Sequence, residues 1–366
     1  MQRESDLQSA LMETISFAGD GIATELIEHE ELADCAATAI EREGEIILSY
    51  GTGAGYTPLR ELIAGRYGVH PYRVILTNGW FQGLVMLTHR RARGRDAVIE
   101  YPTYGKALDQ FFATGATVGY MDRIEGGLRL EELQYSLRTS QKKVSYIYTI
   151  PAFQNPTGTS LSAELRWEMF KLAMRFKTPL LEDDTFGLLR FEGDHVPTIF
   201  EMSAGESIYS SSFSYTVAPG LRVGYFILPD EHAREVAGIA NGTYISPSLI
   251  SQATIFEYIQ RGSFDRHLGE LRDRLRERRD ALTEALVRHL PDTKWLMPEG
   301  GIFLMISLPP GSNGPAMLEA AEGVSALSGT DCGGSPNTLR LNFAEPALEE
   351  IEPGIERLAA ALAAVA

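Results

Sequence analysis

The sequence predicts an α/β protein, with a large domain built on a mainly parallel, seven-stranded sheet and a smaller α+β domain at the C-terminal end. Three observations predict this class. Short apolar runs alternate with helical patterns over residues 73–250, as expected when crossover helices connect parallel strands. A long, charge-rich helical pattern follows at residues 261–289. Two more apolar runs and an amphipathic stretch then end the chain.

Seven apolar runs supply the strands of the large sheet. They occupy residues 74–76, 97–100, 118–121, 144–148, 179–182, 207–209 and 223–227. Helical patterns stand between them at residues 81–89, 105–113 and 163–175. Because ligands of open parallel sheets bind beyond the carboxyl ends of the strands, we expect functional residues to follow these runs.

The chain divides into three predicted parts. Residues 1–45 form an N-terminal arm and a helix that belong to the small domain, and residues 46–260 form the large domain. Residues 261–366 complete the small domain. Outside the large domain, the expected elements are helices at residues 28–42, 261–289 and 348–365 and strands at residues 302–306 and 339–343.

The composition argues against several function classes. The 366 residues carry a net charge of −16, so we expect neither nucleic acid nor an anionic membrane as a partner. No run of about 18 apolar residues occurs, so we expect no membrane span. Residues 1–19 lack the apolar core of a signal peptide. Cys35 and Cys332 have no metal or redox spacing, and the histidines show none either, which predicts a cytoplasmic protein without a metal site.

The clearest functional motif is S-S-S-F-S-Y-T-V-A-P-G-L-R-V-G-Y at residues 210–225. It resembles the cofactor-anchoring segment of class I/II aminotransferases, fold-type I enzymes that use pyridoxal phosphate (PLP), in the branch of 2-aminoadipate aminotransferase. The resemblance implies that Ser212, Ser214 and Arg222 bind the cofactor phosphate. Tyr215 stands where that family has the lysine that forms a Schiff base with PLP, and a phenol cannot form an imine.

The same resemblance implies further parts of a cofactor pocket. N-G-W-F-Q-G at residues 78–83 matches the family's phosphate-binding helix start, with Gly79 kept and Trp80 in place of a serine. In P-T-Y, Tyr104 matches the aromatic residue that stacks on the pyridine ring. Tyr50 matches a tyrosine that reaches the cofactor phosphate of the other subunit, which implies a homodimer.

Three more motifs imply the contacts to the ring and to the substrate. In F-Q-N-P-T-G, Asn155 matches the asparagine that bonds the phenolic oxygen of PLP. In L-E-D-D-T-F-G, Asp183 matches the aspartate that keeps the pyridine nitrogen protonated, and Phe186 replaces a tyrosine. Arg340, in N-T-L-R-L-N-F, matches the arginine that clamps the substrate α-carboxylate. The expected partner is therefore a small molecule with a carboxylate.

Tyr215, Trp80 and Phe186 change three cofactor contacts together. From this we predict a diverged enzyme that does not perform ordinary transamination and acts as a lyase, dehydratase or cyclase in specialised biosynthesis. Two chemistries stay open. The protein holds PLP or pyridoxamine phosphate (PMP) without a covalent bond, or it has lost the cofactor and uses Tyr215 as a general acid or base. Loss of the cofactor is favoured, because Trp80 should crowd the phosphate.

Two alternatives remain beside this prediction. One is a PLP-dependent aminotransferase that carries Tyr215 in place of its lysine, and the other is a non-catalytic binding protein on the same fold. Lys106, two residues after Tyr104, is the lysine best placed to lie near the site, although an exposed helix position is its expected role. In the family, an arm that contains prolines folds over the active site. The corresponding segment here, F-A-G-D-G-I, has no proline and carries Asp20 among small residues, so the function of a substrate lid is not carried over.

Overall fold

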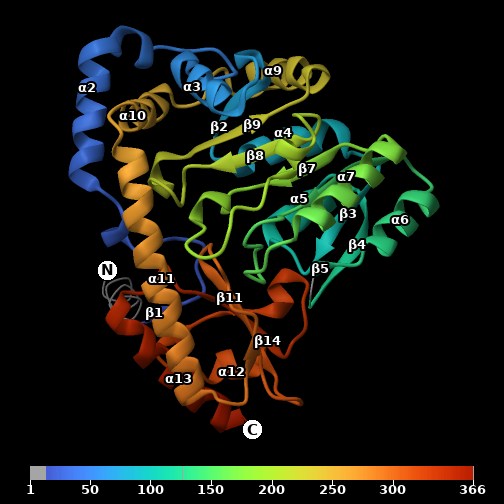
Figure 1. The fold of residues 1–366 in the computed structure, drawn as a ribbon, viewed down its shortest axis with the longest axis vertical. Coiled ribbons are helices and arrows are strands. Elements are labelled where there is room, and N and C mark those ends of the chain that lie inside the picture. The colour runs from blue at the N-terminus through green and yellow to red at the C-terminus, as the bar shows by residue number, and fades with distance from the viewer. Residues whose placement is uncertain (1–13, 126, 366) are drawn as a thin grey trace, which may run out of the picture.

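The computed structural model describes residues 14–125 and 127–365. A large domain with a central sheet lies above a smaller domain that holds the C-terminal part of the chain (Figure 1). Residues 1–13, the first part of the predicted arm, lie outside the described residues. They include most of residues 1–19, for which the sequence predicts no signal peptide.

The large sheet is mixed and has eight strands in the order β2-β9-β8-β7-β6-β3-β4-β5. Neighbours from β8 through β7, β6 and β3 to β4 run parallel, whereas β9 is antiparallel to β2 and β8, and β5 to β4. The strands are β2 (Val74–Asn78), β3 (Asp96–Tyr101), β4 (Thr117–Ile124), β5 (Gly127–Leu128), β6 (Val144–Thr149), β7 (Leu180–Asp183), β8 (Ile208–Ser212) and β9 (Val223–Ile227). The predicted fold class is confirmed, and the added strand is the two-residue β5.

Helices cover both faces of this sheet (Figure 1). The described helices of the two domains together are α2 (His29–Ile47), α3 (Thr57–Tyr67), α4 (Trp80–Arg91), α5 (Gly105–Ala113), α6 (Leu130–Thr139), α7 (Ala163–Phe176), α8 (Ile199–Met202), α9 (Asp230–Tyr244), α10 (Leu249–Gln260), α11 (Ser263–His289), α12 (Gly314–Ala320) and α13 (Ile351–Val365). None of these described helices is both long and apolar enough to cross a membrane.

Alternation along the central strands explains why both faces are covered. Tyr146 and Tyr148 of β6 pack into the core shared with α4, α5 and α9. Ile147, between them, packs into the core shared with α6 and α7. Because successive side chains of a strand point to opposite faces, a strand buried on both sides reads as a continuous apolar run.

The small domain is built on a four-stranded antiparallel sheet in the order β10-β11-β14-β13. Its strands are β10 (Lys294–Trp295), β11 (Phe303–Ser307), β13 (Leu327–Ser328) and β14 (Thr338–Asn342). The long helix α11 runs from the large domain along the small one (Figure 1) and packs there against α13. Near the start of the described chain, β1 (Ile15–Ser16) pairs in parallel with β12 (Val324–Ser325). The predicted domain limits at residues 45 and 260 stay predictions.

The parallel arrangement brings the carboxyl ends of β3, β6, β7 and β8 to one edge of the large sheet. One cavity at this edge is lined by residues that end or follow these strands, including Tyr104, Ile150, Asp183 and Ser212. Ligands of open α/β sheets bind at such an edge, so the fold places the candidate site there.

Candidate active site

One end of the cavity is formed by the N-terminus of α4. Gly79 precedes the helix with a φ of 81°, a left-handed conformation that favours glycine. A β-carbon at Gly79 would lie 2.2 Å from Nη2 of Arg222, so glycine also makes room for the guanidinium. The Arg222 side chain is exposed, and its Nη1 donates to the Pro219 carbonyl at 3.3 Å. Unpaired helix amides beside a guanidinium form an anion site.

Two serines lie beside this anion site. Ser212 ends β8, and its Oγ accepts a hydrogen bond from the Ser214 amide at 3.1 Å. The two hydroxyl oxygens are 2.8 Å apart, and both residues line the cavity together with Arg222. Hydroxyls can rotate to donate to a bound oxyanion. The structure thus brings together Gly79, Ser212, Ser214 and Arg222.

Trp80 directs its indole towards the large sheet. Its Nε1 donates to Ser210 Oγ at 2.8 Å, and its ring stacks near Phe226 with a centroid separation of 6.4 Å and an interplanar angle of 23°. The residue is 7% exposed and still lines the cavity. Trp80 therefore belongs to the core and also takes up space inside the pocket.

Asp183, at the end of β7, is a buried carboxyl held on both oxygens. Oδ1 accepts from the amide and hydroxyl of Thr185 at 3.1 and 2.6 Å, and Oδ2 accepts from the Tyr148 hydroxyl at 3.0 Å. Burial raises the pKa of Asp183 to about 7, against the opposing effect of the hydrogen bonds from Thr185 and Tyr148. A carboxyl that titrates near neutrality can share a proton with a heteroaromatic nitrogen.

Tyr104, Phe186 and Tyr215 give the cavity an aromatic lining. The rings of Phe186 and Tyr215 lie 4.8 Å apart at 33°, and Tyr104 lies 6.3 Å from Trp80. Burial, with the negative charge of Asp20 as the next cause, raises the pKa of Tyr215 far above its ordinary value. The phenol therefore keeps its proton at neutral pH, and the expected use of Tyr215 as a general acid or base stays a prediction.

Arg340 of β14 is 2% exposed and does not line the cavity, which it meets through its contact with the lining residue Asn155. Its Nη1 donates to Asn155 Oδ1 at 3.1 Å and to Asp20 Oδ1 at 2.7 Å. Its Nη2 donates to the carbonyls of Ala18 and Gly19 at 2.6 and 2.9 Å. The carboxylate that Arg340 binds in this structure is therefore that of Asp20.

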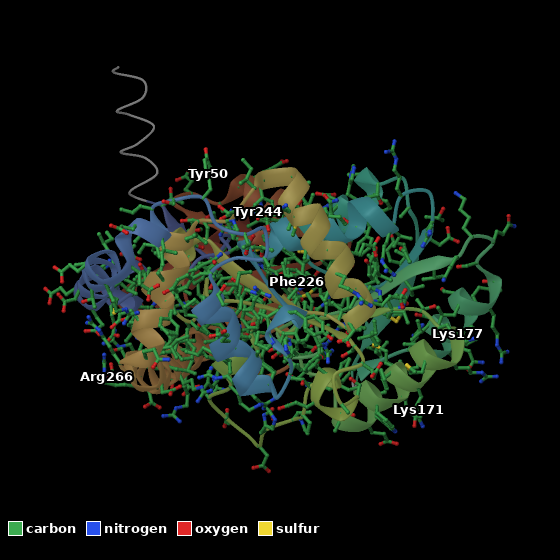
Figure 2. The ribbon with its side chains drawn as sticks, turned by 90° about the horizontal axis from the view of Figure 1, so that it is seen from above. Tyr50, Lys171, Lys177, Phe226, Tyr244 and Arg266 are labelled. Carbon is green, nitrogen blue, oxygen red and sulfur yellow. The ribbon has the colours of Figure 1, made fainter. Side chains whose placement is uncertain are left out.

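Tyr50 and Lys106 lie outside the cavity. Tyr50 is 84% exposed and lies at the edge of the molecule in Figure 2, so its role across a dimer interface stays a prediction. Lys106 occupies an exposed position on α5, as expected, and its Nζ lies 3.5 Å from Asp20 Oδ2. The contact of Lys106 with the site is therefore its ion pair with Asp20.

Three residues near the site had no role assigned from the sequence. Thr185 and Tyr148 position Asp183. The hydroxyl of Tyr148, at the end of an apolar run, was a signal in the sequence for a buried polar contact. Asp20 meets Arg340 across 320 positions of the chain. No local pattern can predict such a contact, although Asp20 did stand out as an acidic residue among small ones.

The lining of the cavity suits PLP better than its volume does. The anion site, the two serine hydroxyls and the Asp183 carboxyl suit the phosphate and the nitrogen of a phosphorylated pyridine. The cavity volume is about 100 Å³, below the roughly 300–1,000 Å³ typical of small-molecule pockets. The donor set therefore fits the cofactor, whereas the space requires a lining side chain such as Trp80 or Tyr215 to move.

Comparisons with known proteins match nearly the whole chain to one family. The family "Aminotransferase class I and II" matches residues 23–358. The aromatic-amino-acid aminotransferase 1 of Thermococcus litoralis is 32% identical over 364 residues, with 95% of this chain and 87% of the relative covered. The 2-aminoadipate transaminase of Thermus thermophilus is 32% identical over 359 residues, with 95% and 90% covered. The crystal structure of kynurenine aminotransferase from Pyrococcus horikoshii, in complex with PMP, is 30% identical, with a TM-score of 0.91 and coverage of 100% of this chain and 95% of that chain.

These findings contradict the prediction of an enzyme that is not a transaminase. Both relatives are named as aminotransferases, and the solved structure holds PMP. They favour PLP-dependent amino-group transfer, and they give no support to lyase, dehydratase or cyclase chemistry. The prediction gave three changed contacts more weight than a likeness that extends over nearly the whole chain.

Proposed function

Because this chain belongs to the class I and II aminotransferases, we propose that it is a PLP-dependent aminotransferase in which Tyr215 stands in place of the anchoring lysine. The observation that carries this proposal is the anion site at Gly79 and Arg222, where glycine leaves room for a guanidinium beside unpaired helix amides. Without a lysine at position 215, the cofactor is held by non-covalent contacts alone.

The residues of the pocket divide the work of holding the cofactor. Arg222, Ser212, Ser214 and the first amides of α4 bind the phosphate. Asp183 is the acidic partner of the pyridine nitrogen, and Tyr104 supplies an aromatic surface for the ring. PLP, when bound, supplies an electron sink for the carbon atom that carries the amino group.

Tyr215 takes a different part from the lysine that it replaces. Its phenol keeps the proton on Oη at neutral pH, because burial and the Asp20 carboxylate raise its pKa. It therefore donates a hydrogen bond and does not accept a proton from the substrate. We expect the chain to transfer amino groups more slowly than a variant with a lysine at this position.

We extend the proposal to a cytoplasmic homodimer. Ile46 lies in the last turn of α2, and Leu48 and Tyr50 follow the helix; all three are large, exposed side chains. Exposed apolar patches mark protein interfaces. The free thiols of Cys35 and Cys332 suit a reducing compartment. Sedimentation velocity should give a dimer for the wild type and a weaker dimer for Tyr50→Ala; a wild-type monomer at micromolar concentration contradicts this part.

The function is tested with Tyr215→Lys reconstituted with PLP. L-phenylalanine and 2-phenylethylamine serve as amino donors, 2-oxoglutarate as the acceptor, and Tyr215→Arg as a cationic control that cannot form the same covalent link. We expect a visible absorbance band and amino transfer from at least one donor in Tyr215→Lys. A variant that binds PLP and transfers nothing from either donor contradicts the proposal.

A further inference from the structure

The arm, defined as residues 17–23, is fixed against β14 and the segment after it. The Asn342 side chain donates to the carbonyls of Gly19 and Gly21 at 3.0 and 2.8 Å. The Gly19 amide donates to Glu345 Oε2 at 2.8 Å. A β-carbon at Gly19 would lie 2.2 Å from Glu345 Oε1, so this close contact depends on glycine. These bonds place Asp20, the next residue, directly at Arg340.

Asp20 satisfies the charge of Arg340. Its Oδ1 lies 2.7 Å from Arg340 Nη1, and its Oδ2 faces Lys106 Nζ at 3.5 Å. The guanidinium packs over the Phe303 ring at 4.2 Å, and its buried Nε has no hydrogen-bond partner among the described residues. A buried guanidinium needs an anionic partner, and here the chain itself provides that partner.

A ligand carboxylate at this position would meet an occupied clamp. Asp20 and the carbonyls of Ala18 and Gly19 already accept from both terminal nitrogens of Arg340. A second carboxylate beside Asp20 would be repelled, because like charges at short range disfavour each other. A protonated amine would be attracted by the same Asp20 charge.

The Asp20 charge also reaches the cavity. After burial, it is the next cause of the raised pKa of both Tyr104 and Tyr215. Both tyrosines line the cavity, so the carboxylate lies close to the place where a substrate amine would react.

We infer that Asp20 is the resident counter-ion of Arg340 and makes the site select primary amines that lack a carboxylate on the carbon bearing the amino group. This inference rests on the proposed amino-group transfer and narrows its substrate class. Asp20 is accordingly a specificity-determining residue, and the arm is the element that positions it.

The test measures carboxylate binding by isothermal titration calorimetry, without cofactor or turnover. The probe is 3-phenylpropanoate, and the variant is Asp20→Asn, which removes the charge and keeps the shape. We expect at least a tenfold gain in affinity over the wild type, the size of one hydrogen bond to a charged group. The matched control is Asp34→Asn, which removes an exposed carboxylate 3.4 Å from Arg261 Nη1 and should change nothing.

Two further variants keep the result interpretable. Asp20→Gly also removes the charge and frees more space. It replaces Asp20→Asn in the titration if circular dichroism shows that Asp20→Asn is not folded. Adding Arg340→Gln to Asp20→Asn should abolish the gain. The inference is overturned if the wild type binds the probe as tightly as both Asp20 variants do.

The same inference predicts the donor preference of Tyr215→Lys. This variant should use 2-phenylethylamine better than L-phenylalanine. The opposite preference would support amino-group transfer and overturn the role of Asp20, whereas no transfer from either donor would contradict the proposed function and leave the calorimetric result standing.

Discussion

The site has an arginine at each of its two ends: Arg222 lines the cavity, and Arg340 lies behind Asn155. The two differ in whether the charge of the arginine is free. Arg222 is exposed, bonds the Pro219 carbonyl at 3.3 Å and has no carboxylate partner among the described residues. Arg340 is buried and paired with Asp20 at 2.7 Å. The first arginine is available to an anionic ligand, whereas the second already has its anion. A retained motif residue therefore does not by itself imply a retained ligand.

The two ends also differ in how the chain builds them. The phosphate end combines a strand-to-helix turn at Gly79 with the loop that carries Arg222. The carboxylate end depends on an arm that docks onto β14 from the other end of the sequence. The phosphate end is therefore built by short segments whose motifs can be read in the sequence. The ligand preference of the carboxylate end depends on a tertiary contact between distant segments.

The largest loss of stability is expected for Trp80→Ser, which enlarges the cavity beside the anion site. Loss of the buried indole should lower the free energy of unfolding by about 3 kcal/mol. The same change should raise PMP affinity roughly tenfold, because it adds space beside the anion site. Chemical denaturation and calorimetry measure the two effects. Trp167→Ser, at an exposed position on α7, should leave PMP affinity unchanged; equal affinities for Trp80→Ser and wild type would show that the indole does not limit the pocket.

Arg222→Gln removes the free charge on which the comparison depends. We expect PMP affinity to fall about a hundredfold, since a hydrogen bond to a charged group contributes about 1.5–3 kcal/mol. Arg222→Lys should lose less, because it keeps the charge without the planar fork. Calorimetric titration measures both. An unchanged PMP affinity in Arg222→Gln would show that the phosphate binds elsewhere.

Asp183→Asn tests the carboxyl at the centre of the pocket. The folded-state pKa of Asp183 is raised to about 7 from 3.8, so the folded protein favours the protonated acid. Wild-type stability should therefore fall as pH rises from about 4 to 7, whereas the neutral asparagine escapes this loss. As the pH rises over this range, the unfolding free energy of Asp183→Asn minus that of the wild type should increase by up to about 1.4 kcal/mol per pH unit.

Urea titrations at pH 4, 5, 6, 7 and 8 give this comparison. The exposed Asp273→Asn is the control, and its difference from the wild type should not vary in this way. A constant difference between Asp183→Asn and the wild type across the range would contradict the raised pKa.

The smallest effect is expected for Gly79→Ala. The backbone of Gly79, with φ 81° and ψ 160°, lies in a region that costs a non-glycine residue about 1–3 kcal/mol, and the added carbon would push against the Arg222 guanidinium. PMP affinity should fall a few-fold as Arg222 shifts. Gly220→Ala is the matched control, because a β-carbon there meets no atom within 4 Å. An affinity loss shared by both variants would remove the special role of Gly79.

The sequence was sufficient to predict the architecture and one end of the pocket. The apolar run at residues 223–227 and the helical pattern at residues 105–113 match β9 and α5 to the residue. The sequence was insufficient for β5, whose two residues carry no pattern, and for the Asp20–Arg340 pair, whose partners are 320 positions apart. Side-chain direction was equally hidden, because the Trp80 indole is directed by its bond to Ser210 on another strand.

The most direct test is a titration of the wild-type protein with PMP, followed by calorimetry and by near-ultraviolet absorbance. We predict saturable binding at one site per chain, about a hundredfold weaker in Arg222→Gln and kept in Asp20→Asn. Absence of saturable binding to the wild type would contradict the claim that the phosphate end of this pocket is open to the cofactor.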